Sequence, residues 1–254
     1  MIAVILAAGR GERLRPLTDN LPKGLIMLNS KSLLEHSLYT LAACAIKKVI
    51  IVVGYKASEV KLRLGPTYAG MELFYVENQE YAASGSMLSL YKAREFIHED
   101  ILLLESDLVF EREAIDVLVH TSKKNVILVA PNRGNGDQVF ICIDTRSHLI
   151  GLGKQIENEA EALGELVGLS KLSLQFLANL CHRAEIEFER NGKNISYEDT
   201  IMLTVKDHGD VVDCIFLENL LWTDIDNEND FKRATKEIFP RIAQFTKHRD
   251  SKTA

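Results

Sequence analysis

The sequence has few cysteines and no long apolar run, and both shortages exclude classes of protein. Its 254 residues contain four cysteines, which lie far apart and form no C-x-x-C or metal-type spacing: Cys44, Cys142, Cys181 and Cys214. This pattern excludes a disulfide scaffold and favours free thiols in a cytoplasmic protein. No apolar run approaches the roughly 18 residues of a membrane-spanning helix, so we expect no membrane partner.

A surplus of basic residues is also absent. Lys and Arg number 30 against 36 for Asp and Glu, which gives a formal net charge of −6. A general nucleic-acid-binding protein usually needs a basic face, so we expect no nucleic-acid partner. The apolar residues 1–9 lack the positive segment of a signal peptide, and a Gly/Arg-rich loop follows them. We therefore interpret them as a buried first strand.

Short apolar, mostly β-branched runs alternate with helix-period segments up to residue 130. The pattern predicts strands at 2–6, 49–53, 71–76, 101–104 and 126–129. It predicts helices at 34–45 (with Ser30 or Ser32 as the cap), 57–64, 87–96 and 114–121. This alternation indicates an α/β fold with a doubly wound, mostly parallel, Rossmann-like sheet.

The pattern changes after residue 130. A turn-rich loop over 132–137 precedes an expected antiparallel hairpin of 139–143 and 149–152. We expect helices at 174–190 and 197–205, a strand at 211–216 and a last helix at 228–247. No repeat or low-complexity linker interrupts the chain. We therefore expect one domain over 1–247, followed by a flexible tail over 248–254.

A glycine-containing loop follows the first strand. Glycines such as Gly9 and Gly11 let a backbone fold sharply and point N–H groups at an anion. The segment is neither a P-loop nor a complete G-x-G-x-x-G, because Leu14 replaces the third glycine. A G-x-G alone is often an ordinary turn. Four cations crowd this one, namely Arg10, Arg13, Arg15 and Lys23, which favours a polyanion ligand over a solvated basic loop.

Residues 6–18, together with Pro22-Lys23, resemble the signature of the nucleotidyltransferases that act on sugar-1-phosphates and phosphocholine. The resemblance implies the nucleotidyltransferase type of sheet. It also implies a loop that binds a nucleoside triphosphate through Leu6, Ala7, Ala8, Gly9, Arg10 and Gly11. The matching arginine and lysine contact the phosphates, so Arg13 and Lys23 are the implied catalytic residues.

Two aspartates are candidate metal ligands. Asp107 follows a predicted strand at the sheet edge where ligands bind, and Asp226 lies before the last helix. Carboxylates suit Mg²⁺, although either residue could instead cap a helix. The family resemblance implies that both hold Mg²⁺, with Asp224 as an alternative ligand.

Three further segments resemble one branch of the family, the 2-aminoethylphosphonate cytidylyltransferases: 102–108, 164–172 and 222–230. This likeness implies transfer of CMP from CTP to the phosphonate oxygen of a small aminophosphonate, with release of pyrophosphate. Residues 15–18 instead match the version common in choline and sugar enzymes. The alternatives are therefore a phosphocholine cytidylyltransferase, a sugar-1-phosphate nucleotidyltransferase and a catalytically silent regulatory homologue.

The resemblance also suggests where the substrates bind. Gly85 and Ser86 match a segment near the nucleotide base, and Lys154 matches a lysine near the acceptor phosphate. Glu165 and Glu198 are our candidates for the acceptor amine, although each also suits an ordinary strand or helix charge. An aromatic cage for choline would draw on Tyr81, Tyr91, Tyr197 and Trp222. Both a monomer and a homodimer stay open.

Overall fold

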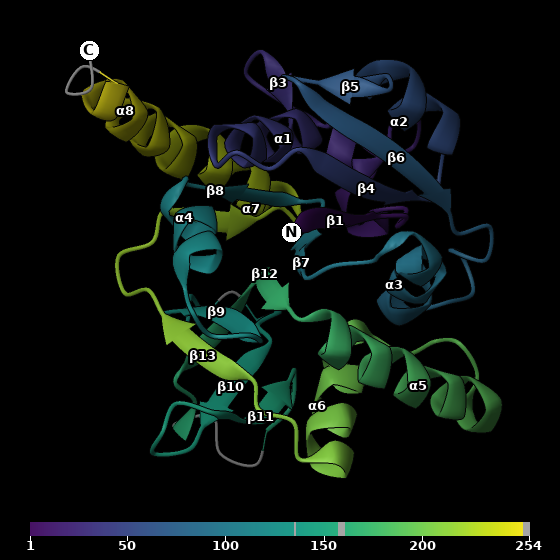
Figure 1. Ribbon diagram of the computed structural model, residues 1–254. Helices are drawn as coiled ribbons and strands as arrows, with labels where there is room; N and C mark the ends of the chain where they lie inside the picture. Colours follow the sequence, from purple (N-terminus) through teal and green to yellow (C-terminus); the bar gives the residue numbers. More distant parts are fainter. Residues whose placement is uncertain (135, 157–160, 251–254) are drawn as a thin grey trace.

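A ten-stranded sheet runs through the middle of the molecule (Figure 1). The structure, a computed structural model, describes residues 1–134, 136–156 and 161–250, with side chains up to residue 244. The strand order is β11-β10-β12-β7-β1-β4-β6-β5, and β9 and β13 extend the sheet from β12. Two small two-stranded sheets lie outside this central sheet.

Four parallel strands form one half of this sheet. They are β1 (Ile2–Ala7), β4 (Lys48–Val53), β6 (Met71–Glu77) and β7 (Ile101–Glu105). Each coincides with a predicted apolar run, and the pairs β1–β4, β1–β7 and β4–β6 are all parallel. The predicted doubly wound, mostly parallel sheet is confirmed.

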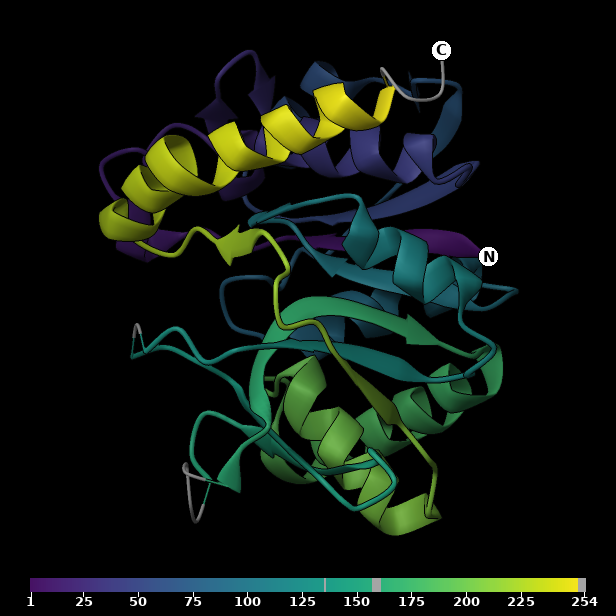
Figure 2. The same ribbon diagram turned by 90° about the vertical axis from the view of Figure 1, so that its left-hand side faces the viewer.

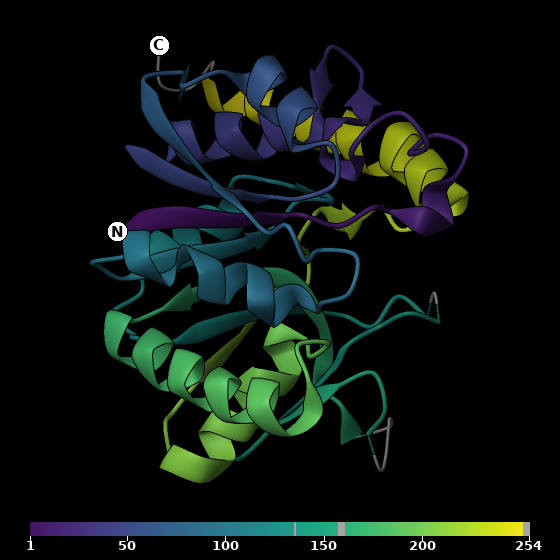
Figure 3. The ribbon, with the colours of Figure 1, turned by 90° about the vertical axis from the view of Figure 1, so that its right-hand side faces the viewer.

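Helices cover both faces of the sheet, as Figures 2 and 3 show. Alternate residues of a strand face opposite sides, so Val4 and Ile5 belong to two different buried clusters. The Val4 side packs against α3 (Ser86–Ala93), α5 (Leu174–Asn191) and α6 (Tyr197–His208). The Ile5 side packs against α1 (Leu33–Ala43), α2 (Ala57–Leu64) and α4 (Glu113–His120). Of the two predicted caps, Ser32 begins α1 and forms a capping box with Glu35.

The other half of the sheet is largely antiparallel. The predicted hairpin is confirmed as β10 (Phe140–Ile143) and β11 (Leu149–Gly153). The strand β12 (Gly164–Leu172) pairs with β7, β9 (Val126–Ala130) and β10, and was not predicted. Its register shifts between Leu166 and Ser170, around Gly168 at φ +80°, so it has no simple apolar alternation. The edge strands are β5 (Thr67–Tyr68), β11 and β13 (Asp213–Phe216), and β13 is parallel to β9.

The C-terminal region departs from one long helix. It consists of α7 (Glu228–Arg233), a π-helical turn (Ala234–Ile238) and α8 (Phe239–Asp250). Pro240 has no N–H for the regular helical ladder, which accounts for the interruption before it. Residues 248–250 of the expected tail lie in α8, and 251–254 lie outside the described residues. Short strands β8 (Leu108–Phe110) and β14 (Trp222–Asp224) pair beside α7, and β2 (Met27–Leu28) pairs with β3 (Lys31–Ser32).

The four cysteines remain separate free thiols, as predicted. Burial raises the pKa of Cys181 to about 11 and that of Cys214 to about 12. Both thiols are therefore protonated at neutral pH and unreactive. Within the described residues, no helix combines the length and the apolar character needed to cross a bilayer.

Candidate active site

The loop after β1 turns sharply at Gly11. This residue has φ +63°, the left-handed region that glycine adopts without strain. Its carbonyl oxygen accepts a 2.7 Å hydrogen bond from Thr18 Oγ1, and a Cβ here would lie 3.0 Å from Cβ of Lys23. Glycine therefore lets Lys23 approach the loop closely. The Arg10 side chain instead packs on Tyr55, with its guanidinium carbon 5.4 Å from the centre of the ring.

Lys23 lies between the two aspartates that the sequence singled out. Its Nζ is 2.5 Å from Asp107 Oδ2 and 2.5 Å from Asp226 Oδ1, and Arg13 Nη2 is 2.9 Å from the same Asp226 oxygen. Burial alone would lower the pKa of Lys23, but the two carboxylates outweigh burial and raise this pKa above its ordinary value. Burial raises the pKa of Asp226, although Lys23 opposes this shift. The structure thus joins the predicted phosphate-binding and metal-binding residues in one cluster.

Main-chain contacts bring the two aspartates together. Strands β8 and β14 pair so that Leu108 faces Asp224, and the Ile225 N–H donates to the Asp107 carbonyl at 3.1 Å. Asp230 Oδ2 then accepts from the Asp226 N–H at 3.1 Å. Backbone pairing therefore fixes the separation of the two carboxylates.

One oxygen of Asp107 shows that this pair fits a divalent cation. Asp107 Oδ1 is buried and accepts no hydrogen bond from any described residue. A buried acceptor without a partner is costly, and carboxylate oxygens are the hard donors that Mg²⁺ prefers. Asp107 and Asp226 would hold the ion. Asp224, the alternative ligand, instead accepts from Arg133 at 2.9 Å.

A cavity of about 450 Å³ opens at the carboxyl ends of β1 and β7. It is lined by Leu6, Ala8, Gly9, Gly11, Glu12, Arg13, Lys23, Asn78, Tyr81, Ser84, Gly85, Ser86, Ser89, Glu105, Ser106, Asp107, Tyr197, Glu198 and Asp226. Four predicted site residues are missing from this lining, although the structure describes all of them: Ala7, Arg10, Lys154 and Glu165. The cavity thus gathers the loop, the aspartate pair, the expected base segment and Glu198.

Gly85 and Ser86, the segment expected near the nucleotide base, contact the residues that precede α6. Its N–H donates to the Lys193 carbonyl at 2.9 Å, and a Cβ on Gly85 would lie 2.0 Å from the Ile195 carbonyl oxygen. The neighbouring Ser86 Oγ accepts from the Tyr197 N–H at 2.9 Å. The expected nucleotide side and acceptor side of the cavity are therefore in direct contact.

Two further acidic side chains, Glu105 and Glu198, line the cavity. Tyr197 Oη donates to Glu105 Oε1 at 2.6 Å, and Ser86 Oγ lies 3.5 Å from Glu198 Oε2. Burial raises the pKa of both glutamates, and the negative charge of Asp107 raises that of Glu105 further. Glu105 was not predicted as a site residue. It directly follows the predicted strand at 101–104, at the sheet edge where ligands bind, and this position was an available signal.

Lys154 does not line the cavity and pairs with Asp137. Its Nζ is 2.5 Å from Asp137 Oδ1, while Arg13 bonds to the other oxygen of the same carboxylate. The two cations hold the pKa of Asp137 at about 2, below its ordinary value, although burial opposes this shift. No sequence motif marked Asp137, which lies in the turn-rich loop between β9 and β10.

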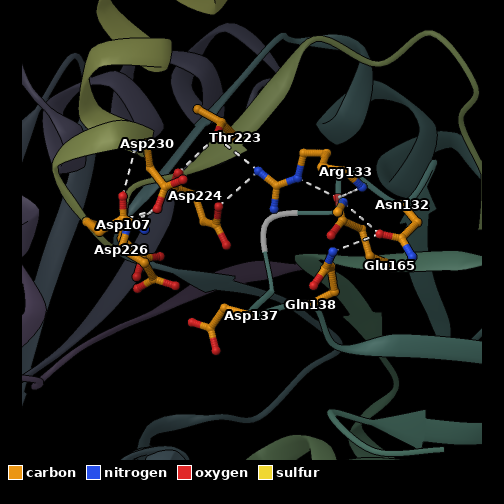
Figure 4. Close-up of polar contacts among 12 residues, drawn as sticks. Asp107, Asn132, Arg133, Asp137, Gln138, Glu165, Thr223, Asp224, Asp226 and Asp230 are labelled. Atoms are coloured by element: carbon orange, nitrogen blue, oxygen red, sulfur yellow. Dashed lines mark hydrogen bonds and ion pairs between the residues drawn. The ribbon is translucent and has the colours of Figure 1, made fainter. Parts of the chain in front are cut away.

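Glu165 lies outside the cavity, in an ion-pair network around Arg133 (Figure 4). The Arg133 N–H and guanidinium both donate to Glu165 Oε1, and Nη1 also reaches Asp224 Oδ1 at 2.9 Å and Thr223 Oγ1 at 3.0 Å. Burial raises the pKa of Glu165, although Arg133 opposes this shift. Glu165 is therefore ion-paired with Arg133. The structure does not bring the two glutamates predicted for the acceptor amine, Glu165 and Glu198, together.

The chain is similar in sequence to a phosphonate synthase and to two cytidylyltransferases. It is 35% identical over 125 residues to the CMP-5'-(3-aminopropyl)phosphonate synthase of Streptomyces rubellomurinus, covering 49% of this chain and 20% of that protein. It is 36% identical over 111 residues to the choline-phosphate cytidylyltransferase of Streptococcus pneumoniae, covering 44% and 47%. The chain thus spans less than half of these two relatives. It is 25% identical over 195 residues to the CTP:phosphoglutamine cytidylyltransferase of Campylobacter jejuni, covering 71% and 76%.

Solved structures share the fold. The inositol-1-phosphate CTP transferase of T. maritima superposes with a TM-score of 0.77 at 20% identity, covering 94% of this chain and 95% of that one. The CTP:phosphocholine cytidylyltransferase of Streptococcus pneumoniae gives 0.72 at 21% identity, covering 92% and 97%. Residues 3–173 also match the model of the MobA-like NTP transferase domain. Because this match covers more than half of the chain, the protein belongs to the family of MobA-like NTP transferase domains.

Proposed function

We propose that the protein is a Mg²⁺-dependent cytidylyltransferase that transfers CMP from CTP to the phosphonate oxygen of a small aminophosphonate, such as 2-aminoethylphosphonate. The observation that carries this proposal is that one cavity is lined by cations and by carboxylates. Arg13 and Lys23 line it together with Glu105 and Glu198. The two cations suit a triphosphate, and the two glutamates suit the ammonium group of a zwitterionic acceptor.

The reaction is an in-line substitution at phosphorus. A phosphonate oxygen attacks the α-phosphorus of CTP, the new O–P bond forms, and the bond to the β-phosphate oxygen breaks to release pyrophosphate. Phosphate monoesters have a second pKa near about 6, so a comparable acceptor is already anionic at neutral pH and needs no general base. Catalysis then depends on positioning and charge neutralisation by Arg13 and Lys23. A divalent cation held by Asp107 and Asp226 would supply further positive charge to the triphosphate.

Glu198 and Lys154 suit the two ends of the acceptor. Glu198 lines the cavity, and the positive charge of Lys154 acts on it and opposes the rise of its pKa. Lys154 would meet the phosphonate and Glu198 the ammonium group. Glu165 is neutralised by Arg133 and does not line the cavity. Glu198 would therefore bind the amine of the acceptor, and Glu105 is the other glutamate of the lining that could assist it.

The aromatic residues favour a primary amine over choline. Trp222 is covered by Arg133, and Tyr91 stacks on Arg94 away from the cavity. Tyr197 uses its hydroxyl for Glu105. Of the four expected cage residues, Tyr81 and Tyr197 line the cavity. A quaternary ammonium, which needs several aromatic faces, would find too few of them here.

The likeness to a choline-phosphate cytidylyltransferase makes phosphocholine the second candidate acceptor. The test is pyrophosphate release with CTP and Mg²⁺, comparing 2-aminoethylphosphonate, phosphocholine, phosphoethanolamine and glucose-1-phosphate at equal concentration. We expect kcat/KM to be at least about tenfold higher for 2-aminoethylphosphonate than for phosphocholine. A preference for phosphocholine or glucose-1-phosphate would overturn the acceptor assignment. Absence of pyrophosphate release with all four would contradict the cytidylyltransferase itself.

A further inference from the structure

Two cations that the proposed function assigns to different substrates share one carboxylate. Arg13 would meet the triphosphate and Lys154 the phosphonate, yet both bond to Asp137 through separate oxygens. The side chains of Arg13 and Lys154 are 56% and 62% exposed, whereas that of Asp137 is 23% exposed. The carboxylate is thus more buried than the cations that it holds.

A hydrogen bond joins Asn132, near the start of the β9–β10 loop, to Gln138, the residue after Asp137 (Figure 4). Asn132 Oδ1 accepts from the Gly134 N–H and from Gln138 Nε2, both at 2.9 Å. Arg133 anchors the start of this loop to β12 and β14 through its ion pairs. These contacts on both sides of Asp137 restrain the loop that carries it.

We propose that Asp137 is a specificity-determining residue that takes the place of substrate phosphates while the site is empty. Its two oxygens match the edge of a phosphoryl or phosphonyl group, so Arg13 and Lys154 keep their charge-assisted hydrogen bonds without substrate. A small anion that reaches one cation must compete with this carboxylate. A triphosphate and a phosphonate bound together replace both contacts, so the site selects the pair of substrates over a single small anion.

The test measures anion binding without turnover. Titration calorimetry compares the natural protein with Asp137→Asn, using pyrophosphate as the probe for Arg13 and methylphosphonate as the probe for Lys154. Asparagine keeps the shape of the side chain and removes the charge. We expect both probes to bind about fivefold more tightly to the variant, because exposed ion pairs contribute modest energies. Unchanged or weaker binding of either probe would overturn the proposal.

Two further variants make the test specific. Asp144→Asn removes a carboxylate that pairs with Arg146 and His148 in the β10–β11 turn, and it should change neither affinity. Adding Lys154→Ala to Asp137→Asn should abolish the gain for methylphosphonate; a gain that persists would show that it does not come from releasing Lys154. Because no step requires CTP turnover, these results stand apart from the success or failure of the proposed cytidylyl transfer.

Discussion

The guanidinium of Arg133 lies over the indole ring of Trp222, with 4.0 Å between its central carbon and the ring centroid. The stacked guanidinium forms ion pairs with both Glu165 and Asp224. Asp224 ends β14, two residues before Asp226. Trp222 thereby supports the network from one side. Trp222 is itself buried, at 4% exposure, so its ring is not available to a cage for a quaternary ammonium.

Replacing Arg133 by methionine should destabilise the protein strongly. The change leaves the buried Glu165 and the half-buried Asp224 without their cation, and breaking a buried ion pair typically costs about 3–5 kcal/mol. Urea denaturation monitored by circular dichroism gives the free energy of unfolding. Arg146→Met is the matched control, because the Arg146 side chain is 77% exposed and should cost well under about 1 kcal/mol. Equal losses for the two variants would contradict a structural role of Arg133.

Lys23→Ala and Asp107→Ala should each lower kcat by roughly 10²-fold or more. The first removes positive charge beside the triphosphate, and the second removes the carboxylate with the unpartnered buried oxygen. Initial rates of pyrophosphate release test both variants, with thermal unfolding to show that each is folded. The exposed Lys124→Ala is the control and should retain full activity. Near-normal rates in a Lys23 or Asp107 variant would refute its assigned role.

Gly85→Ala should lower the free energy of unfolding by about 1–3 kcal/mol. The new Cβ would lie 2.0 Å from the Ile195 carbonyl oxygen, so the base segment and the chain before α6 must move apart. Gly9→Ala offers a matched control, because a Cβ there meets nothing within 4 Å. Thermal unfolding curves of the two variants measure this loss of stability. Similar stability for both variants would mean that Gly85 tolerates a side chain.

Acceptor binding should weaken at acid pH because of Glu198. Burial raises the pKa of this carboxyl above its ordinary value of 4.5. The ionised form binds an ammonium group, so KM for 2-aminoethylphosphonate should fall as the pH rises through that raised pKa. In Glu198→Gln, KM should be higher and this pH dependence should disappear, while KM for CTP serves as the internal reference. A variant that keeps the natural pH profile would exclude Glu198 as the amine ligand.

The parallel half of the fold could be predicted because β1, β4 and β7 are apolar on both faces, β6 is a mainly apolar run with one buried face, and helix-period segments separate the strands. The strand β12 could not, since the register shift at Gly168 breaks the apolar pattern. Glu165 lies on β12 and faces Ala130, at the end of β9, so its partner Arg133 could not be recognised without that pairing. A single sequence shows that a charge is present, but it does not show which distant charge neutralises it.

Some residues of the candidate site could be predicted from the sequence and others could not. The glycine loop, Lys23 and the two aspartates follow from local motifs, and the structure brings Lys23 within 2.5 Å of both carboxylates. Asp137 comes from a loop whose course the sequence leaves open. Its bonds to Arg13 and Lys154 depend on how three separate segments fold around the cavity.

The hydrogen bond from the Ile225 N–H to the Asp107 carbonyl also constrains the order in which the site can arise. The ribosome makes Lys23 and Asp107 within the first 107 residues, but Asp226 comes 119 residues later. Until residue 226 has been made, the cluster around Lys23 lacks one of its two carboxylates. Under the proposed function, a nascent chain without Asp226 would not turn over nucleoside triphosphates.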